Sequence, residues 1–133
     1  MPERQLTQKK IMIIDDERDF ADILKARLEG RGYTVLALSD AKFIISELRN
    51  FEPDVILLDM LMPGDGGLEV GEILNGDPAG VKTPVIIVSG LNKNVDKIKA
   101  YKLGIEDYIV KPVNFDLLLA SIEKSIRAKR DRD

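Results

Sequence analysis

The chain has 133 residues, of which 44% are hydrophobic and 32% charged, and its net charge is −3. This length suits one domain, and the scattered Lys and Arg residues argue against direct nucleic-acid binding, which needs a clustered basic surface. Cysteine and histidine are both absent, which excludes disulfides, a thiol nucleophile, serine–histidine chemistry and histidine-ligated zinc. No apolar run is long enough for a membrane span or a signal peptide, so we expect a cytoplasmic protein without membrane contact.

The first apolar run, Lys10 to Ile14, follows a polar arm over residues 1–8 and predicts a buried strand. This strand runs into the acids Asp15-Asp16-Glu17. Apolar residues then recur at helical spacing, and glycines at 30 and 32 are expected to end that helix. The predicted inward face of the helix consists of Phe20, Ile23, Leu24 and Leu28.

The second strand is expected from Tyr33 to Leu38. Ser39 or Asp40 can cap the helix that follows. The predicted inward face of this helix consists of Ala41, Ile44, Ile45 and Leu48. Pro53 presets the turn into the third strand, because its ring fixes the backbone angle that a turn requires.

The third apolar run, Val55 to Asp59, ends in a carboxylate at the carboxyl end of a predicted central strand. Open α/β sheets bind ligands at that edge, although a lone Asp there is more often a cap or turn residue. A weaker helix is expected after the Pro-Gly turn, with Val70, Ile73 and Leu74 facing inward. The stretch from Asn75 to Thr83 is predicted to be a loop, because Gly and Asp-Pro interrupt it.

Two more strands are predicted, Pro84 to Val88 ending at Ser89-Gly90, and Asp107 to Val110 ending at Lys111-Pro112. A helix is expected between them, from about Val95 to Leu103. The last helix has the clearest apolar stripe. That stripe consists of Phe115, Leu118, Leu119, Ile122 and Ile126.

Apolar strands that alternate with amphipathic helices predict an α/β fold, a doubly wound, flavodoxin-like five-stranded parallel sheet with five helices. Right-handed crossovers favour the strand order 2-1-3-4-5. In that order the ends of strands 1 and 3 flank the switch point of the sheet. The polar residues that follow the strands then share one edge: Asp15, Asp16, Asp59, Ser89 and Lys111.

Three crowded carboxylates repel one another and are stable as anions only beside a cation. Oxygen ligands without His or Cys indicate Mg²⁺ rather than zinc. A magnesium-neutralised carboxylate beside one hydroxyl and one ammonium suits phosphoryl transfer with Asp59 as the nucleophile. Each residue also has a simpler interpretation: Asp15-Asp16 could cap the first helix, Ser89 could be a turn residue, and Lys111 could be a surface lysine.

These motifs together resemble the receiver domain of two-component response regulators, of the chemotaxis-Y type, over roughly residues 9–127. The resemblance is carried by Ile14-Asp15-Asp16-Glu17, Asp59-Met60-Leu61-Met62-Pro63 with Gly67, Ser89-Gly90, and Gly104 with Tyr108 and Lys111-Pro112. It divides the chain into a flexible arm over 1–8, a receiver domain over 9–127, and a charged tail or linker start over 128–133.

The resemblance implies that Asp59 is the phosphoacceptor. Asp16 would bind Mg²⁺ directly and Asp15 would bind it mainly through water. Asp59 and the main-chain carbonyl of Leu61 would be further ligands, and Mn²⁺ can substitute for Mg²⁺. Ser89 and Lys111 would bind the phosphoryl group.

The resemblance also implies roles outside the direct phosphoryl contacts. Tyr108 would move inward on activation, and Pro112 would follow a cis peptide bond after Lys111. Pro63 and Gly67 would be structural. Leu61 and Leu91, two residues after Asp59 and Ser89, would tune the lifetime of the phosphoryl group.

On this interpretation the chain is a signalling switch in a phosphorelay and catalyses only its own phosphorylation and dephosphorylation. Because the chain itself has no His, it cannot be its own phosphohistidine donor. The phosphoryl group would come from a sensor histidine kinase, a histidine phosphotransfer protein or a small phosphodonor. The fourth helix, fifth strand and fifth helix would form the face that changes for an output partner or a homodimer.

Two alternatives remain open at this point. One is a receiver-like docking module that is never phosphorylated, although such modules usually lose an acid or the lysine. The other is a haloacid-dehalogenase-like phosphatase, which needs a second Asp where this chain has Leu61.

Overall fold

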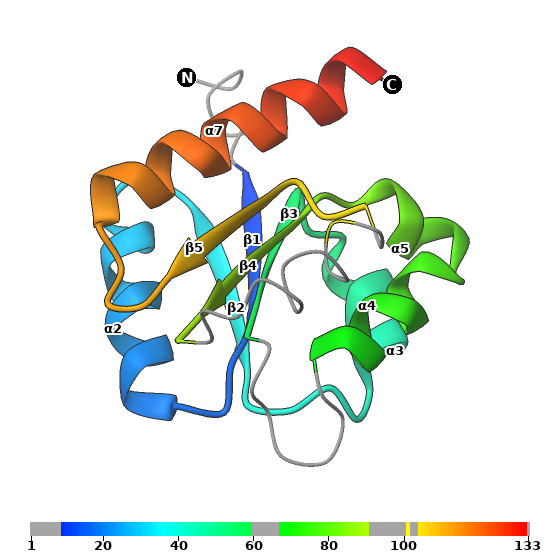
Figure 1. Cartoon of the computed structure of the whole chain (residues 1–133), viewed down its shortest axis with the longest axis horizontal. Coiled ribbons are helices and arrows are strands. Elements are labelled where there is room, and N and C mark those ends of the chain that lie inside the picture. Colours follow the sequence, from blue (N-terminus) through cyan, green and yellow to red (C-terminus); the bar gives the residue numbers. More distant parts are fainter. Residues whose placement is uncertain (1–8, 60–66, 91–100, 102–103, 133) are drawn as a thin grey trace.

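A five-stranded parallel sheet in the order β2-β1-β3-β4-β5 forms the middle of the computed structural model (Figure 1), which describes residues 9–59, 67–90, 101 and 104–132. The strands are β1 (Lys10–Ile14), β2 (Thr34–Leu38), β3 (Val55–Leu58), β4 (Val85–Ser89) and β5 (Asp107–Val110). Every pair of neighbouring strands is parallel. The predicted fold class and strand order are therefore confirmed.

Helices cover both faces of the sheet (Figure 1). The helices of the described residues are α2 (Arg18–Glu29), α3 (Ile44–Phe51), α4 (Gly67–Asn75), α5 (Pro78–Lys82) and α7 (Phe115–Arg132). Helices α2 and α7 pack on one face, and α3 and α4 pack on the other. None of these helices is long and apolar enough to cross a membrane.

The sheet separates two apolar clusters, and successive residues of a strand belong to different clusters. Ile11 and Ile13 pack with α2 and α7, whereas Met12 and Ile14 pack with α3 and α4. Both faces are thus buried, which explains why β3 is apolar at every position and β1 is apolar at every position after Lys10. Each fully buried side chain of this kind contributes about 1.5–3 kcal/mol, so the clusters stabilise the sheet that positions its edge residues.

The predicted burial of two residues is wrong. Ile23 on α2 is 64% exposed and Ile73 on α4 is 43% exposed. Each residue turns the helix by about 100°, so these side chains point away from their buried neighbours Leu24 and Leu74. The last helix, by contrast, buries Phe115, Leu118 and Ile122 as its stripe predicts.

The predicted cap of the second helix is also wrong. Helix α3 begins at Ile44 with Phe43 in the capping position, and no side chain caps it. Asp40 instead closes the turn before the helix, because its Oδ1 accepts a hydrogen bond from the Lys42 amide at 2.9 Å. Ala41 lies in that turn and is still buried in the second cluster.

The predicted loop from Asn75 to Thr83 contains the short helix α5. Asp77 caps this helix, because its Oδ2 accepts hydrogen bonds from the amides of Ala79 and Gly80 at 3.0 and 3.2 Å. Pro78 occupies the first turn, where its missing amide hydrogen costs nothing. Asp-Pro was interpreted as a turn signal, but it is equally the start signal of a helix.

Other boundaries differ little from the prediction. Helix α7 continues to Arg132, so most of the charged segment that was predicted as a tail is helical. The helix expected from about Val95 to Leu103 falls, apart from Tyr101, outside the described residues. Helix α2 ends at Glu29, directly before Gly30, as predicted.

Gly80 provides a test of how closely α5 packs against α4. A Cβ atom on Gly80 would lie 2.3 Å from the carbonyl oxygen of Leu74, whereas one on Gly76 would lie 3.5 Å from the nearest atom, the Glu72 carbonyl oxygen. We expect Gly80→Ala to lower the free energy of unfolding by about 1–3 kcal/mol, because backbone must shift. Urea unfolding measures this, with Gly76→Ala as the control. Equal stability of the two variants would contradict the close approach of α5 to α4.

Candidate functional site

Backbone hydrogen bonds fix three polar residues just beyond the strands. The amide of Asp15 donates to the Leu38 carbonyl at 3.0 Å, and the amide of Asp59 donates to the Ile14 carbonyl at 3.0 Å. The amide of Lys111 donates to the Ser89 carbonyl at 2.9 Å. The parallel ladder therefore extends one residue past the strands and holds these backbones at the carboxyl edge of the sheet.

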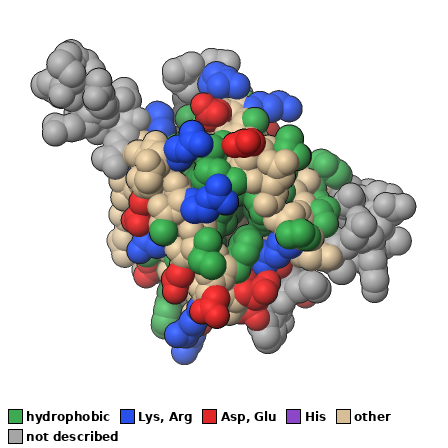
Figure 2. Space-filling view, turned by 90° about the vertical axis from the view of Figure 1, so that its left-hand side faces the viewer, with side chains coloured by type: hydrophobic (Ala, Val, Ile, Leu, Met, Phe, Trp, Pro, Cys, Tyr) green, Lys and Arg blue, Asp and Glu red, His purple; other side chains and the backbone are tan. Residues whose placement is uncertain are grey.

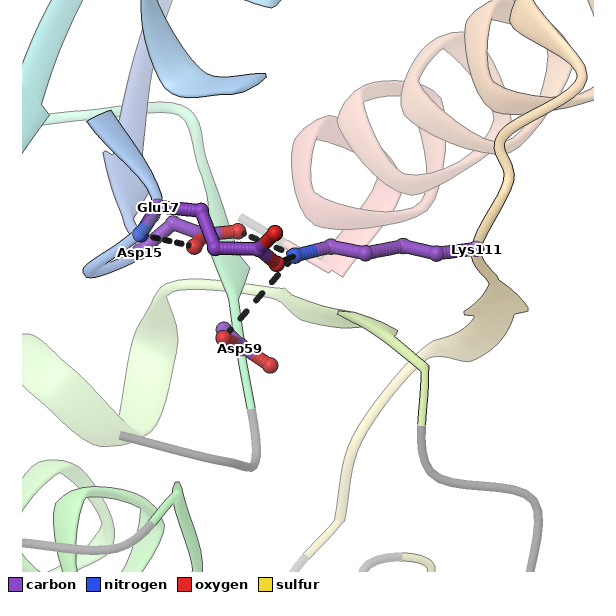
Figure 3. Close-up of polar contacts among 4 residues, drawn as sticks. All are labelled: Asp15, Glu17, Asp59 and Lys111. Atoms are coloured by element: carbon purple, nitrogen blue, oxygen red, sulfur yellow. Dashed lines mark hydrogen bonds and ion pairs between the residues drawn. The ribbon is translucent and has the colours of Figure 1, made fainter. Parts of the chain in front are cut away.

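The side chains of Asp15, Glu17, Asp59 and Lys111 converge at this edge (Figure 3). Lys111 follows β5, and its side chain reaches toward the ends of β1 and β3 (Figure 3). Its Nζ donates to Asp15 Oδ2 at 2.8 Å and to Glu17 Oε1 at 2.6 Å. Asp59 Oδ2 lies 3.9 Å from the same nitrogen, which is an ion pair but too long for a hydrogen bond.

Burial differs sharply among these groups. Asp15 and Asp59 are buried, and 13% of the Lys111 side chain is exposed, whereas the Glu17 side chain is 61% exposed. The ring of Phe20 covers the ammonium of Lys111 at 4.2 Å. The buried part of the site therefore holds two carboxylates and one ammonium, and the third carboxylate faces water.

Burial raises the pKa of Asp15, and the charge of Asp59 raises it further, although hydrogen bonds from Lys111 and the Glu17 amide oppose both. For Lys111, burial alone would lower the pKa, but the hydrogen bonds to Asp15 and Glu17 outweigh it and raise the pKa. Because Asp15 has a raised pKa in the folded state, its stabilising contribution is present below the unfolded pKa and is lost as pH rises through the folded pKa. Ionisation of Asp15 thus opposes folding.

The carboxylates offer a set of donors for a hard cation. One oxygen from each of Asp15, Glu17 and Asp59 lies within 4.8 Å of the others. Oxygen donors alone suit Mg²⁺, and the Lys111 ammonium shows that this position attracts positive charge. Asp16, which was predicted to bind the metal directly, does not belong to this group among the described residues.

Glu17 is the site residue that the sequence analysis did not assign to the site. Asp15 Oδ1 accepts a hydrogen bond from the Glu17 amide at 2.9 Å, a turn that Asp side chains commonly form two residues ahead. This turn places Glu17 beside Lys111 rather than along the strand direction. The Asp-x-Glu spacing after the first strand was the available signal.

The other predicted residues are placed as follows. Ser89 is fully buried at the end of β4, and Tyr108 on β5 is half-buried against the second cluster. Gly67 is the first residue of α4, and the Lys111–Pro112 peptide bond is cis. The predictions for Leu61, Pro63 and Leu91 concern residues outside the described part of the chain.

Comparison with known proteins supports the resemblance that the sequence motifs indicate. The family model of the response regulator receiver domain matches residues 11–123. A CheY-like response regulator receiver domain protein from Methanospirillum hungatei JF-1 superposes with a TM-score of 0.88 at 26% identity, and the match covers 96% of this chain and 100% of that one.

Two other solved structures are similar. The receiver domain of the Francisella response regulator 1452 is 29% identical with a TM-score of 0.81, over 91% of this chain and 98% of that one. The signal receiver domain of a signal transduction histidine kinase from Syntrophus aciditrophicus is 28% identical with a TM-score of 0.81, over 90% of this chain and 91% of that one.

The crowding of acids predicts that removing one charge stabilises the fold. We expect Asp59→Asn to raise the free energy of unfolding by about 1 kcal/mol at pH 7 without divalent cations, because it removes repulsion against buried Asp15. Asp22→Asn, the same change at an exposed position of α2, should have little effect. Chemical unfolding followed by circular dichroism compares them, and a less stable Asp59→Asn variant would contradict the repulsion.

Proposed function

Because the chain belongs to the response regulator receiver domain family, we propose that it is a phosphorylation-activated two-component switch in which Asp59 accepts the phosphoryl group. Receiver domains act with histidine kinases or phosphotransfer proteins. The observation that carries the proposal is the meeting of Asp59, Asp15 and Lys111 at one edge of the sheet. These groups supply a nucleophile, a cation-binding carboxylate and a cation for the transferred group.

In the proposed reaction a carboxylate oxygen of Asp59 attacks the phosphorus of a phosphohistidine. The new oxygen–phosphorus bond gives an acyl phosphate as the nitrogen–phosphorus bond breaks, and the imidazole nitrogen keeps the electron pair. Lys111 would pair with a phosphoryl oxygen, and the Ser89 hydroxyl would donate a hydrogen bond to another. Hydrolysis of the acyl phosphate later restores Asp59.

Mg²⁺, or Mn²⁺ in its place, would neutralise charge on the phosphoryl oxygens when bound. Asp15 and Asp59 would hold it, which is supported by the proximity of their oxygens, within 4.8 Å of each other. Asp16 and the Leu61 carbonyl complete the proposed ligand set, and Asp16 would have to turn toward the group of acids. The donor chemistry of the described residues fits such a hard ion.

We place the docking of the phosphohistidine partner on the side of α2 and the start of α7. Figure 2 views the molecule from this side and shows hydrophobic side chains gathered among Lys, Arg and acidic groups. Ile23 on α2 and Leu117 on α7 are exposed hydrophobic residues of these helices. Arg27 of α2 covers the ring of Phe115 of α7 at 3.9 Å, so the two helices adjoin.

The output face would consist of β5, α7 and the chain between β4 and β5. Tyr108 packs against the second cluster, and its movement with Ser89 would change this face for an output partner or a homodimer. We expect a cytoplasmic switch that does not itself contact nucleic acid or turn over other substrates.

Labelling tests the phosphoacceptor. With Mg²⁺ and radiolabelled acetyl phosphate, we expect the wild type to take up acid-stable, alkali-labile label, and Asp59→Asn to take up none. Asp22→Asn should label like the wild type, because its carboxylate is exposed on α2. Label on Asp59→Asn would overturn the assignment. No label and no Mg²⁺ affinity in the wild type would favour a docking module, and turnover of phosphate esters would favour a phosphatase.

The lifetime of the label tests the two leucines. We propose a long-lived phosphoryl group, because Leu61 and Leu91 can exclude the attacking water but cannot orient it. Leu61→Asn and Leu91→Glu should therefore shorten the half-life of the labelled protein. Val81→Asn, at an exposed position of α5, is the control. An unchanged half-life in both test variants would refute the role of these side chains.

A further inference from the structure

Among the described residues, the segment that joins β1 to α2 accepts both side-chain hydrogen bonds of the Lys111 ammonium. Asp15 and Glu17 accept its hydrogen bonds at 2.8 and 2.6 Å, and the Phe20 ring lies 4.2 Å away. Asp59 lies 3.9 Å from the same nitrogen. Figure 3 shows the Glu17 carboxylate beside the ammonium, with Asp59 below the two groups.

We infer that Glu17 is a positioning residue that holds Lys111 away from Asp59 in the unphosphorylated domain and competes with the phosphoryl group for the ammonium. This inference rests on the proposed function. An ammonium has three hydrogen-bond donors. The contacts with Asp15 and Glu17 use two of them, and the ring of Phe20 covers part of the remaining surface.

The difference in burial decides which contact breaks when Lys111 turns to a phosphoryl oxygen. Asp15 is buried, so leaving its carboxylate without Lys111 would be costly. The Glu17 side chain is 61% exposed, so water can replace Lys111 there. The ammonium can therefore keep Asp15 and exchange Glu17 for a phosphoryl oxygen.

The charge of Glu17 also acts through space. Its carboxylate lies in the group of acids that includes Asp59, so it repels an incoming phosphoryl group as well as competing for Lys111. A test has to separate these two effects. Glu17→Asp does so, because the shorter side chain keeps the charge but withdraws the carboxylate from Lys111.

The experiment compares the rate at which acetyl phosphate labels the wild type, Glu17→Gln, Glu17→Asp and Asp19→Asn, all at saturating Mg²⁺. Asp19→Asn is the matched control, because it removes an exposed charge from the first turn of α2. We expect both Glu17 variants to label about two- to fivefold faster than the wild type, as for the loss of a solvent-exposed ion pair. Asp19→Asn should change the rate less.

A cycle with Lys111→Met adds an independent criterion. Without the ammonium, Glu17→Asp should no longer change the rate, because there is nothing left to compete for. Urea unfolding checks that each variant is folded. If Glu17→Asp is not folded, Glu17→Gln is compared in the wild type and in Lys111→Met, because only the competition for the ammonium disappears with Lys111.

Three outcomes would overturn the inference. The first is an unchanged rate in Glu17→Gln, and the second is a wild-type rate in Glu17→Asp beside a faster Glu17→Gln, which would assign the effect to charge alone. The third is an effect of Glu17→Asp that persists in Lys111→Met. A wild type that takes up no label would overturn the proposed function and this inference with it, whereas the other outcomes concern Glu17 alone.

Discussion

Two buried carboxylates share one ammonium at the edge of the sheet, and the arrangement of the rest of the chain makes this possible. Asp15 and Asp59 cannot move apart, because their amides are bonded to the carbonyls of Leu38 and Ile14. Burying like charges costs free energy, which the two apolar clusters of the sheet offset. The ammonium of Lys111 therefore neutralises only part of the negative charge of Asp15 and Asp59.

The contacts of the Lys111 ammonium also link the site to the backbone at the ends of the strands. Lys111 belongs to the segment after β5, and its amide is bonded to the carbonyl of Ser89 after β4. A change in the contacts of its ammonium can therefore affect the backbone at the ends of β4 and β5. Tyr108 lies one strand position from Ile109, but on the opposite face, where α3 and α4 pack. A two-state equilibrium biased at the edge could reach the surface of β5 by this route.

The sequence was sufficient for the sheet and for most of its edge, and it failed where a contact depends on distant parts of the chain. Runs such as Ile11 to Ile14 and Val55 to Leu58 are apolar at every position, which only a sheet covered on both faces requires. Strand order then brought Asp15, Asp59 and Lys111 together. The contact of Glu17 with Lys111 spans 94 residues, so the local Asp-x-Glu spacing alone could not predict it. The exposure of Ile23 follows from its rotation about the helix axis, and Asp77-Pro78 is equally a turn signal and a helix start, so neither local pattern was decisive.

The alternation of strand residues between two clusters has a consequence for divergence. Ile13 and Ile14 are adjacent in the chain but pack in different clusters, on opposite sides of the sheet. Substitutions in α2 or α7 should therefore combine almost additively with those in α3 or α4, since the sheet lies between these helices. During divergence, the core residues of α2 and α7 can therefore change independently of those of α3 and α4. The charged edge is different, because the strands that position Asp15, Asp59 and Lys111 pack against both clusters.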